Sequence, residues 1–122
     1  MKVYSFEKLI VWQESRDLVL RVYSDTSTFP KDEMFGITNQ MRRAAISVSS
    51  NIAEGSGAIT PKEQANYYKT AFGSLMELLN QLILSVDLKY IKADNLESFY
   101  RPLIDKIGFK INALRKATLN GL

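Results

Sequence analysis

The chain has 122 residues, 46% of them hydrophobic and 24% charged, which is typical of a globular protein and leads us to expect one domain over residues 1–122. It contains no histidine and no cysteine, which excludes the commonest general base and metal ligand, disulfide bonds and zinc–thiolate sites. The net charge is +3, with seven basic and seven acidic side chains in residues 1–61 and nine basic and six acidic in residues 62–122, an excess compatible with a polyanionic partner.

The first predicted helix runs from about residue 6 to residue 26, with Ser5 as its N-cap, and is apolar over more of its circumference than one core requires. One side is expected to face the core: Leu9, Trp12, Val19, Leu20 and Tyr23. A second stripe, formed by Val11, Leu18 and Val22, lies at a clearly different angle about the helix axis. It is either apolar surface left exposed on a small bundle or a subunit interface. We favour the interface, and hence self-association.

The second predicted helix, from about residue 37 to residue 54, is rich in small residues. Its apolar positions recur at helical spacing and form one seam: Met41, Ala45, Val48 and Ile52. A strip of small and polar residues lies beside the seam: Gln40, Ala44, Ser47, Asn51 and Gly55. Because small side chains let a neighbouring helix approach closely, we expect this helix to be buried on more than one side.

The third and fourth predicted helices have clear start signals. Thr60-Pro61-Lys62-Glu63 is a capping box with proline at the first helical position, and Asp94 is the expected cap of the fourth helix, which runs to about residue 118. The third helix carries an apolar seam over three heptads: Ala65, Tyr68, Phe72, Leu75, Leu79, Leu82 and Val86. Since the connections are short and no segment alternates like a strand, we predict an all-α, antiparallel up-down-up-down four-helix bundle.

Three stretches carry a family resemblance: LIVWQESRDLVLRVY, FPKDEMFGITNQMRRAAISVSSNIAEGSG and TAFGSLMELLNQLILSVDLKYI. They resemble successive blocks of the small bacterial four-helix-bundle proteins known as 23S ribosomal RNA intervening-sequence proteins, and the match covers nearly the whole chain. The resemblance implies a homopentameric ring of bundles. It also implies kinship with the accessory proteins of diversity-generating retroelements, basic pentamers thought to bind nucleic acid and a reverse transcriptase.

Six basic residues are candidates for nucleic-acid binding: Arg42, Arg43, Lys106, Lys110, Arg115 and Lys116. Arg42 and Arg43 are adjacent on the second helix, where a guanidinium either binds phosphate in bidentate fashion or forms a structural ion pair. The other four lie on the fourth helix, on different sides of its core stripe. They form either a solvated helix face or, summed over a ring, a strong positive field.

The NIAEG stretch offers Asn51, Glu54 and Gly55 as either a structural motif or part of a ligand site, and we favour the structural role. Glu54 is expected to have a partner such as an arginine, because a carboxylate near a helix C-terminus is otherwise unfavourable. Glu54 and Glu77 are also a weak pair of ligands for a hard cation such as magnesium. Without histidine no serine has a partner base, so we expect no catalytic residue, no metal site and no cofactor.

The N-terminus lacks an apolar signal core, and no run of residues is apolar enough to span a bilayer. We therefore expect a cytoplasmic protein without a membrane partner. Our leading interpretation is a non-enzymatic scaffold, a homopentamer that binds RNA or DNA through its basic surface. The alternative is a scaffold that docks a partner protein, such as a reverse transcriptase, without touching nucleic acid.

Overall fold

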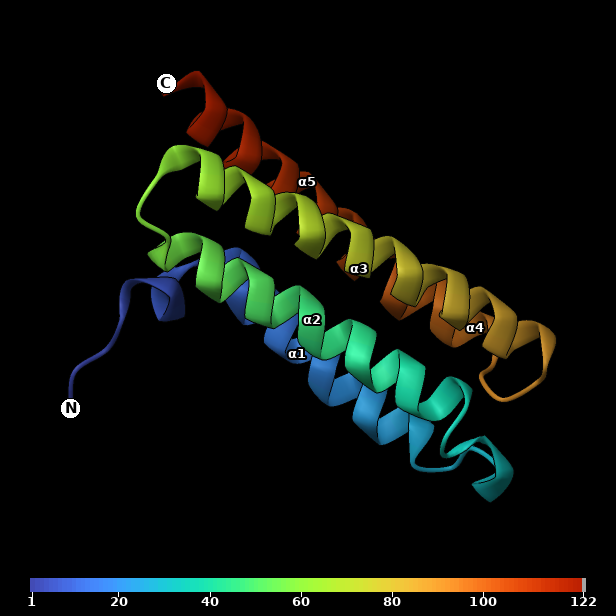
Figure 1. Cartoon of the computed structure of the whole chain (residues 1–122). Coiled ribbons are helices and arrows are strands. Elements are labelled where there is room, and N and C mark those ends of the chain that lie inside the picture. The colour runs from blue at the N-terminus through green and yellow to red at the C-terminus, as the bar shows by residue number, and fades with distance from the viewer. Residues whose placement is uncertain (122) are drawn as a thin grey trace.

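The computed structural model describes residues 1–121, and these residues are helical with short connections. A 3-10 helix, Ser5–Lys8, precedes α1 (Ile10–Thr26), and a 3-10 turn, Lys31–Glu33, precedes α2 (Ile37–Gly57). Then come α3 (Pro61–Asp87), the single turn α4 (Ala93–Asn95), a π-helical turn, Leu96–Tyr100, and α5 (Arg101–Asn120). The last three run on without a break, so the described chain holds four long helical segments and no strand, which confirms the predicted all-α class (Figure 1).

The long helices lie side by side in one bundle. In Figure 1 the colour gradient runs one way along α1, returns along α2, and repeats this reversal in α3 and α5. The α2–α3 connection consists only of residues 58–60. Because it is so short, α3 must run back beside α2. Within residues 1–121, no helix has the length and apolar character needed to cross a membrane.

The core face of α1 differs from the predicted one. Val11, Leu18 and Val22 are 3%, 0% and 0% exposed within a single chain, whereas Leu20, expected in the core, is 61% exposed. The prediction that Val11, Leu18 and Val22 form an exposed subunit interface is therefore wrong, since these side chains are already covered by the other helices of the same chain.

Two hydroxyl residues explain the error. Ser15 and Thr26 are buried and complete the core stripe of α1 together with Val11, Leu18 and Val22. The Ser15 hydroxyl donates to the Trp12 carbonyl at 2.6 Å, and the Thr26 hydroxyl donates to the Val22 carbonyl at 2.7 Å. Because each hydroxyl finds its acceptor in its own helix, it enters the core without an unmet hydrogen bond.

The packing of α2 confirms the predicted seam and part of the small-residue strip, in which Ala44 and Gly55 are buried but Gln40 is exposed. The seam residues Met41, Ala45, Val48 and Ile52 are each 0% exposed. On the strip, Gly55 is buried so close to α3 that a Cβ added to it would lie 2.7 Å from Cε1 of Tyr68. A side chain of any size at this position has no room, so glycine is what permits the close approach of the two helices.

The helix starts are confirmed in part. The Thr60 hydroxyl accepts a hydrogen bond of 3.1 Å from the Glu63 amide, with proline in the first turn of α3, as the capping pattern predicts. Asp94 is not a cap, because the helix begins one residue earlier, and Ser5 lies inside the 3-10 helix. The π-helical turn ends two residues before Pro102, whose missing amide and ring disturb the regular α-helical hydrogen bonding of the preceding turn.

Candidate nucleic-acid interface

The Arg42 side chain is engaged in contacts within its own chain. Its Nε donates to the Thr26 hydroxyl at 2.9 Å, and its guanidinium lies over the Tyr23 ring, 4.7 Å from the ring centre. Both partners lie on α1, so the Arg42 side chain joins α2 to α1 through a hydrogen bond and a cation–π contact. The structural alternative describes Arg42 better than the phosphate contact does.

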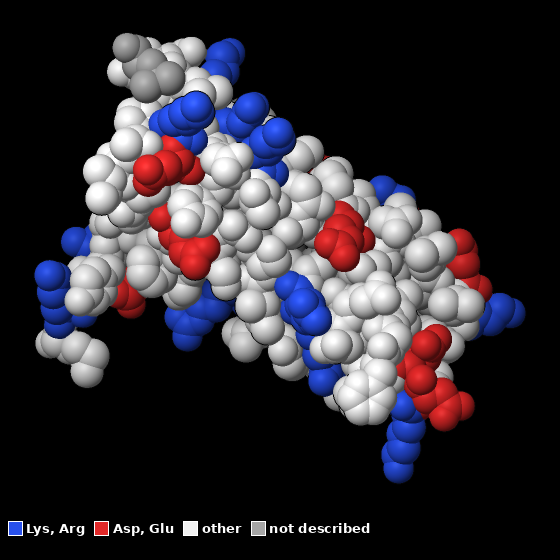
Figure 2. Space-filling model, viewed as in Figure 1, with Lys and Arg blue, Asp and Glu red and all other residues white. Residues whose placement is uncertain are grey.

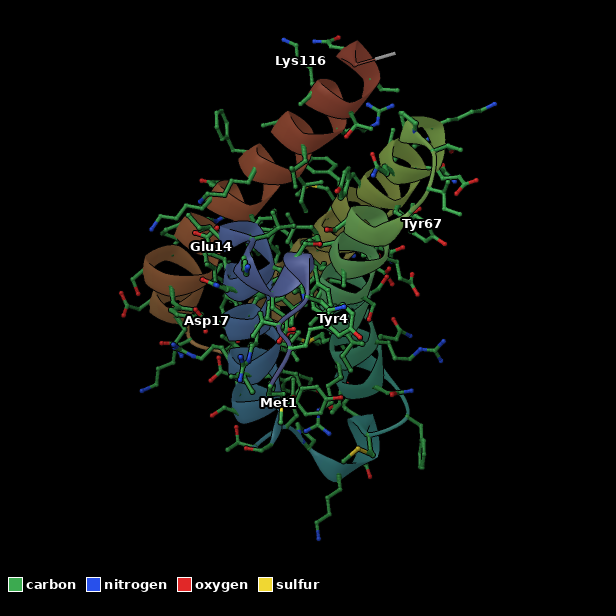
Figure 3. The ribbon with its side chains drawn as sticks, turned by 90° about the vertical axis from the view of Figure 1, so that its left-hand side faces the viewer. Met1, Tyr4, Glu14, Asp17, Tyr67 and Lys116 are labelled. Atoms are coloured by element: carbon green, nitrogen blue, oxygen red, sulfur yellow. The ribbon has the colours of Figure 1, made fainter. Side chains whose placement is uncertain are left out.

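Lys110 is likewise paired. Its ammonium group lies 2.8 and 3.0 Å from the two carboxylate oxygens of Glu14, and Figure 3 shows Glu14 on the side of α1 that faces α5. The side chains of Lys110 and Glu14 are 35% and 18% exposed, so water only partly screens this ion pair. The pair links the first and last long helices and leaves little free charge at Lys110 for a phosphate.

Arg43 is exposed and lines a polar groove between α2 and α3. Glu77, from α3, lines the same groove together with Asn39, Gln40, Ser47 and Ser74. A carboxylate that shares the groove reduces the positive potential around Arg43. Arg42 and Arg43 are adjacent in sequence but occupy different surroundings, so they do not form one basic site.

Lys106, Arg115 and Lys116 are exposed on α5, and Arg115 lies beside two lysines of α3. Arg115, Lys62 and Lys69 line an open depression of about 440 Å³ at the end of the bundle, where α3 begins and α5 ends. Figure 2 shows basic side chains gathered at this end, at the upper left of the view, and Figure 3 labels Lys116 near the tip of α5. We call Lys62, Lys69 and Arg115 the cationic cluster.

The two lysines of the cationic cluster were missed in the sequence, although a signal was present. Lys62 and Lys69 are seven residues apart and thus share one face of a helix. An up-down-up-down course also places the start of the third helix beside the end of the fourth. The basic residues of these two segments lie on different helices, so neither helix taken alone shows the cluster.

The charges of the whole bundle are divided unequally between its ends. The end that holds the cationic cluster, residues 1–17, 47–73 and 106–122, carries nine basic and five acidic side chains, a net charge of +4. The opposite end, residues 18–46 and 74–105, carries seven basic and eight acidic side chains, a net charge of −1. In Figure 2 blue and red groups are accordingly mixed at the right of the view. The positive electrostatic potential is therefore stronger at the first end.

The NIAEG residues are structural in the described chain, with one exception. Asn51 donates to the Ser47 carbonyl at 2.8 Å and to its hydroxyl at 3.0 Å, and the Ser47 hydroxyl lies 2.7 Å from that of Ser74 on α3. Gly55 permits the close contact with Tyr68, whose pKa is raised because burial disfavours its charged form. Glu54 is exposed and forms no ion pair within residues 1–121, so the arginine expected beside it is not found there.

Glu54 and Glu77, the weak pair of cation ligands, belong to no larger acidic cluster in the described residues. The Glu77 carboxylate accepts a hydrogen bond of 3.3 Å from the Gln81 side chain, one turn along α3. No group of three or more acidic side chains within residues 1–121 is arranged to hold a metal ion. The cationic cluster instead places three exposed basic side chains around one open depression, an arrangement suited to an anionic ligand.

A protein-family model matches most of the chain. The family model described as 23S rRNA-intervening sequence protein matches residues 7–113, from the 3-10 helix before α1 to the second half of α5. No curated protein matches the chain.

Proposed function

The chain belongs to the 23S rRNA-intervening sequence protein family, and from this premise we propose that it is a non-enzymatic scaffold that binds nucleic acid, RNA or DNA, at the end of the bundle that carries the cationic cluster. We further propose that the antiparallel bundles assemble into a homopentameric ring. The family name refers to ribosomal RNA, which makes RNA the first ligand to test.

The observation that carries the proposal is the cationic cluster. Lys62, Lys69 and Arg115 are exposed and line one depression with a single acidic residue, Glu63. Lysine and arginine that neutralise phosphates release condensed counterions, so the binding gains free energy that depends strongly on salt. Contacts of this kind read the phosphate backbone and not the bases, which fits a scaffold that acts through charge and shape.

A ring strengthens such a site without any new contact. Five copies would present five cationic clusters to one RNA, and after the first contact each further contact is intramolecular. A modest charge on each bundle then suffices for tight binding. Assembly and binding are therefore expected to be coupled, with the assembled protein binding more tightly than an isolated bundle.

The test is fluorescence anisotropy of a structured RNA and a duplex DNA, titrated with protein at low and moderate salt. The site variant is Lys62→Gln, Lys69→Gln, Arg115→Gln. The matched control is Lys31→Gln, Lys89→Gln, Lys92→Gln, which removes three exposed cations from the opposite end. Log affinity falls as log salt rises. If each of the three cations contacts one phosphate, the site variant makes this negative slope shallower by about 2 to 3.

Two outcomes would contradict the proposal. Absence of binding at low salt, where exposed positive charge acts most strongly, would exclude the electrostatic interaction. Equal losses in the site variant and the control would show that net charge alone matters and that the cationic cluster is not the site.

The second candidate function is a scaffold that docks a partner protein. Large apolar side chains at both ends favour it, above all Phe35, which is 94% exposed, and Ile59, which is 93% exposed. Exposed apolar patches mark protein interaction sites more often than isolated exposed residues do. Assembly without any affinity for RNA or DNA at low salt would support this candidate, for which a reverse transcriptase is the partner to test.

A further inference from the structure

The turn between α1 and α2 presents an apolar projection to solvent. Phe35 is 94% exposed and Met34 is 45% exposed, directly after Asp32 and Glu33. We call residues 31–36 the Phe35 turn. Exposure this high for a phenylalanine leaves almost the whole ring in water, at a cost that another surface would remove by covering it.

The Phe35 turn is held in one conformation. The Glu33 carboxylate accepts a hydrogen bond of 2.9 Å from the Tyr90 hydroxyl, and the Glu33 carbonyl accepts one of 2.9 Å from the Gly36 amide. The first bond fastens the turn to the connection that follows α3. A projection that is already ordered loses little entropy on binding, which favours its use as a contact.

An apolar groove lies at the opposite end of the bundle, between the start of α1 and the second half of α5. Its volume is about 490 Å³, and Lys8 and Lys110 are its only charged lining residues. The remaining lining is apolar: Leu9, Ile10, Val11, Ala113, Leu114 and Ala117. Alanine on the α5 side leaves the groove hollow, and Ile10 on the α1 side is 63% exposed. We call this the α1/α5 groove.

The Phe35 turn cannot reach the α1/α5 groove of its own chain. Ile10 opens α1 and the Phe35 turn follows its far end, so the 17 residues of α1, about 25 Å at 1.5 Å per residue, separate the two. The fitting partner is a second copy of the chain. Charge favours the same pairing, because the groove lies at the end with net charge +4 and the turn lies at the end with net charge −1.

We propose that the Phe35 turn of one copy packs into the α1/α5 groove of the next, head to tail. The contact joins two different surfaces, so each copy uses its turn toward one neighbour and its groove toward the other. Contacts of this type close into a ring when the rotation between copies allows it. The inference rests on the proposed assembly and names the surfaces that build it.

The first test is the mass of the particle in solution, measured by light scattering. Phe35→Asp should reduce the assembly to a monomer, because it places a charge in the apolar contact. Ile59→Asp is the matched control, since Ile59 is 93% exposed and lies outside the α1/α5 groove. The control should keep the mass of the unmodified protein, and circular dichroism should give the same helicity for both variants.

A mixing experiment tests the head-to-tail geometry. Ala113→Trp fills the groove at an exposed position and leaves the turn intact, whereas Phe35→Asp removes the turn and leaves the groove intact. Each variant alone should be monomeric. Mixed in equal amounts, they should form a particle of two copies and no larger, since only one intact turn and one intact groove remain to pair.

The outcomes separate this contact from the proposals on which it depends. If the unmodified protein is itself a monomer, the proposed assembly and this contact both fail. If the unmodified protein assembles but Phe35→Asp keeps its mass, the assembly stands and this contact is wrong. Nucleic-acid binding does not enter the measured mass, so the anisotropy titration decides it independently.

Discussion

The phenol of Tyr100 donates a 2.5 Å hydrogen bond to Asp25, the same carboxylate that Arg21 holds in an ion pair at 3.1 Å. Tyr100 is 0% exposed and belongs to the π-helical turn before α5, while Asp25 lies near the end of α1. The Arg21 guanidinium also lies over the Phe99 ring, 4.1 Å from its centre. These side chains join two helices that are distant in sequence at the end of the bundle opposite the cationic cluster.

This arrangement predicts a loss of stability at alkaline pH. Burial raises the pKa of Tyr100 far above its ordinary value, and the hydrogen bond to Asp25 raises it further. Above pH of about 10 the unfolded chain releases this proton and the folded chain keeps it, so folding stability falls as pH rises. Tyr100→Phe should remove that dependence and make the slope of unfolding free energy against pH shallower by up to about 1.4 kcal/mol per pH unit.

Urea denaturation between pH 8 and 11 measures the difference between Tyr100→Phe and the unmodified protein. At pH 8 the variant should be less stable by about 1.5 to 3 kcal/mol, the usual loss for a hydrogen bond to a charged group. Both proteins keep the other tyrosines and all lysines, so their contributions cancel in the comparison. If the curves of unfolding free energy against pH are parallel for the two proteins over the whole range, the Tyr100 proton does not contribute to the pH dependence of stability.

Gly55→Ala should destabilise the protein. The new methyl group would lie 2.7 Å from Cε1 of Tyr68 and 3.0 Å from Cβ of Tyr67, so α2 and α3 would have to move apart. Overpacking of this kind costs about 1 to 3 kcal/mol, more than the gain in helix propensity from replacing glycine.

Gly73→Ala is the matched control for Gly55→Ala. A Cβ added to Gly73 meets nothing within 4 Å, so the substitution should stabilise α3 by about 0.5 to 1 kcal/mol. Urea denaturation of both variants should therefore give changes of opposite sign. The same sign for both would mean that the contact of Gly55 with Tyr68 does not limit the packing.

Leu18→Glu should unfold the chain. Leu18 is 0% exposed and has no polar partner in the core, so a carboxylate at this position would be buried without compensation. Leu20→Glu, two residues away and 61% exposed, should retain the full helical signal in circular dichroism. If Leu18→Glu instead remains folded and its particle mass is smaller than that of the unmodified protein, the stripe of Val11, Leu18 and Val22 would be a subunit interface after all.

Arg42 and Arg43 should respond differently to the same substitution. Arg42→Gln removes the hydrogen bond to Thr26 and the contact with the Tyr23 ring, which should lower the free energy of unfolding by about 1 to 2 kcal/mol. Arg43→Gln changes an exposed side chain and should alter it by less than about 0.5 kcal/mol. Thermal unfolding of the two variants at one pH measures this difference directly.

Much of the fold could be predicted because apolar spacing and helix caps are local signals. The Thr60 cap and the seam of Met41, Ala45, Val48 and Ile52 needed no knowledge of the other helices. The core face of α1 could not be predicted in the same way, because Ser15 and Thr26 look polar in sequence. Their hydroxyls donate hydrogen bonds to carbonyls of their own helix, and only the structure reveals these bonds.

The candidate site was less predictable because it combines residues from different helices. Lysine and arginine look alike in sequence whether they are free or paired. Lys110 lies 96 positions from Glu14, its ion-pair partner, and Arg42 lies 16 positions from Thr26. These pairings show which cations are already engaged, whereas the grouping of Lys62, Lys69 and Arg115 could have been inferred from their spacing and from the predicted course of the bundle.

The three-residue connection between α2 and α3 also has a consequence for how the chain folds. Gly55 meets Tyr68 only 13 positions along, whereas Tyr100 meets Asp25 across 75 positions. Short loops cost less entropy to close, so we expect the α2–α3 hairpin to be formed in the folding transition state before α1 and α5 meet. In stopped-flow measurements Gly55→Ala should then slow refolding, and Tyr100→Phe should instead accelerate unfolding.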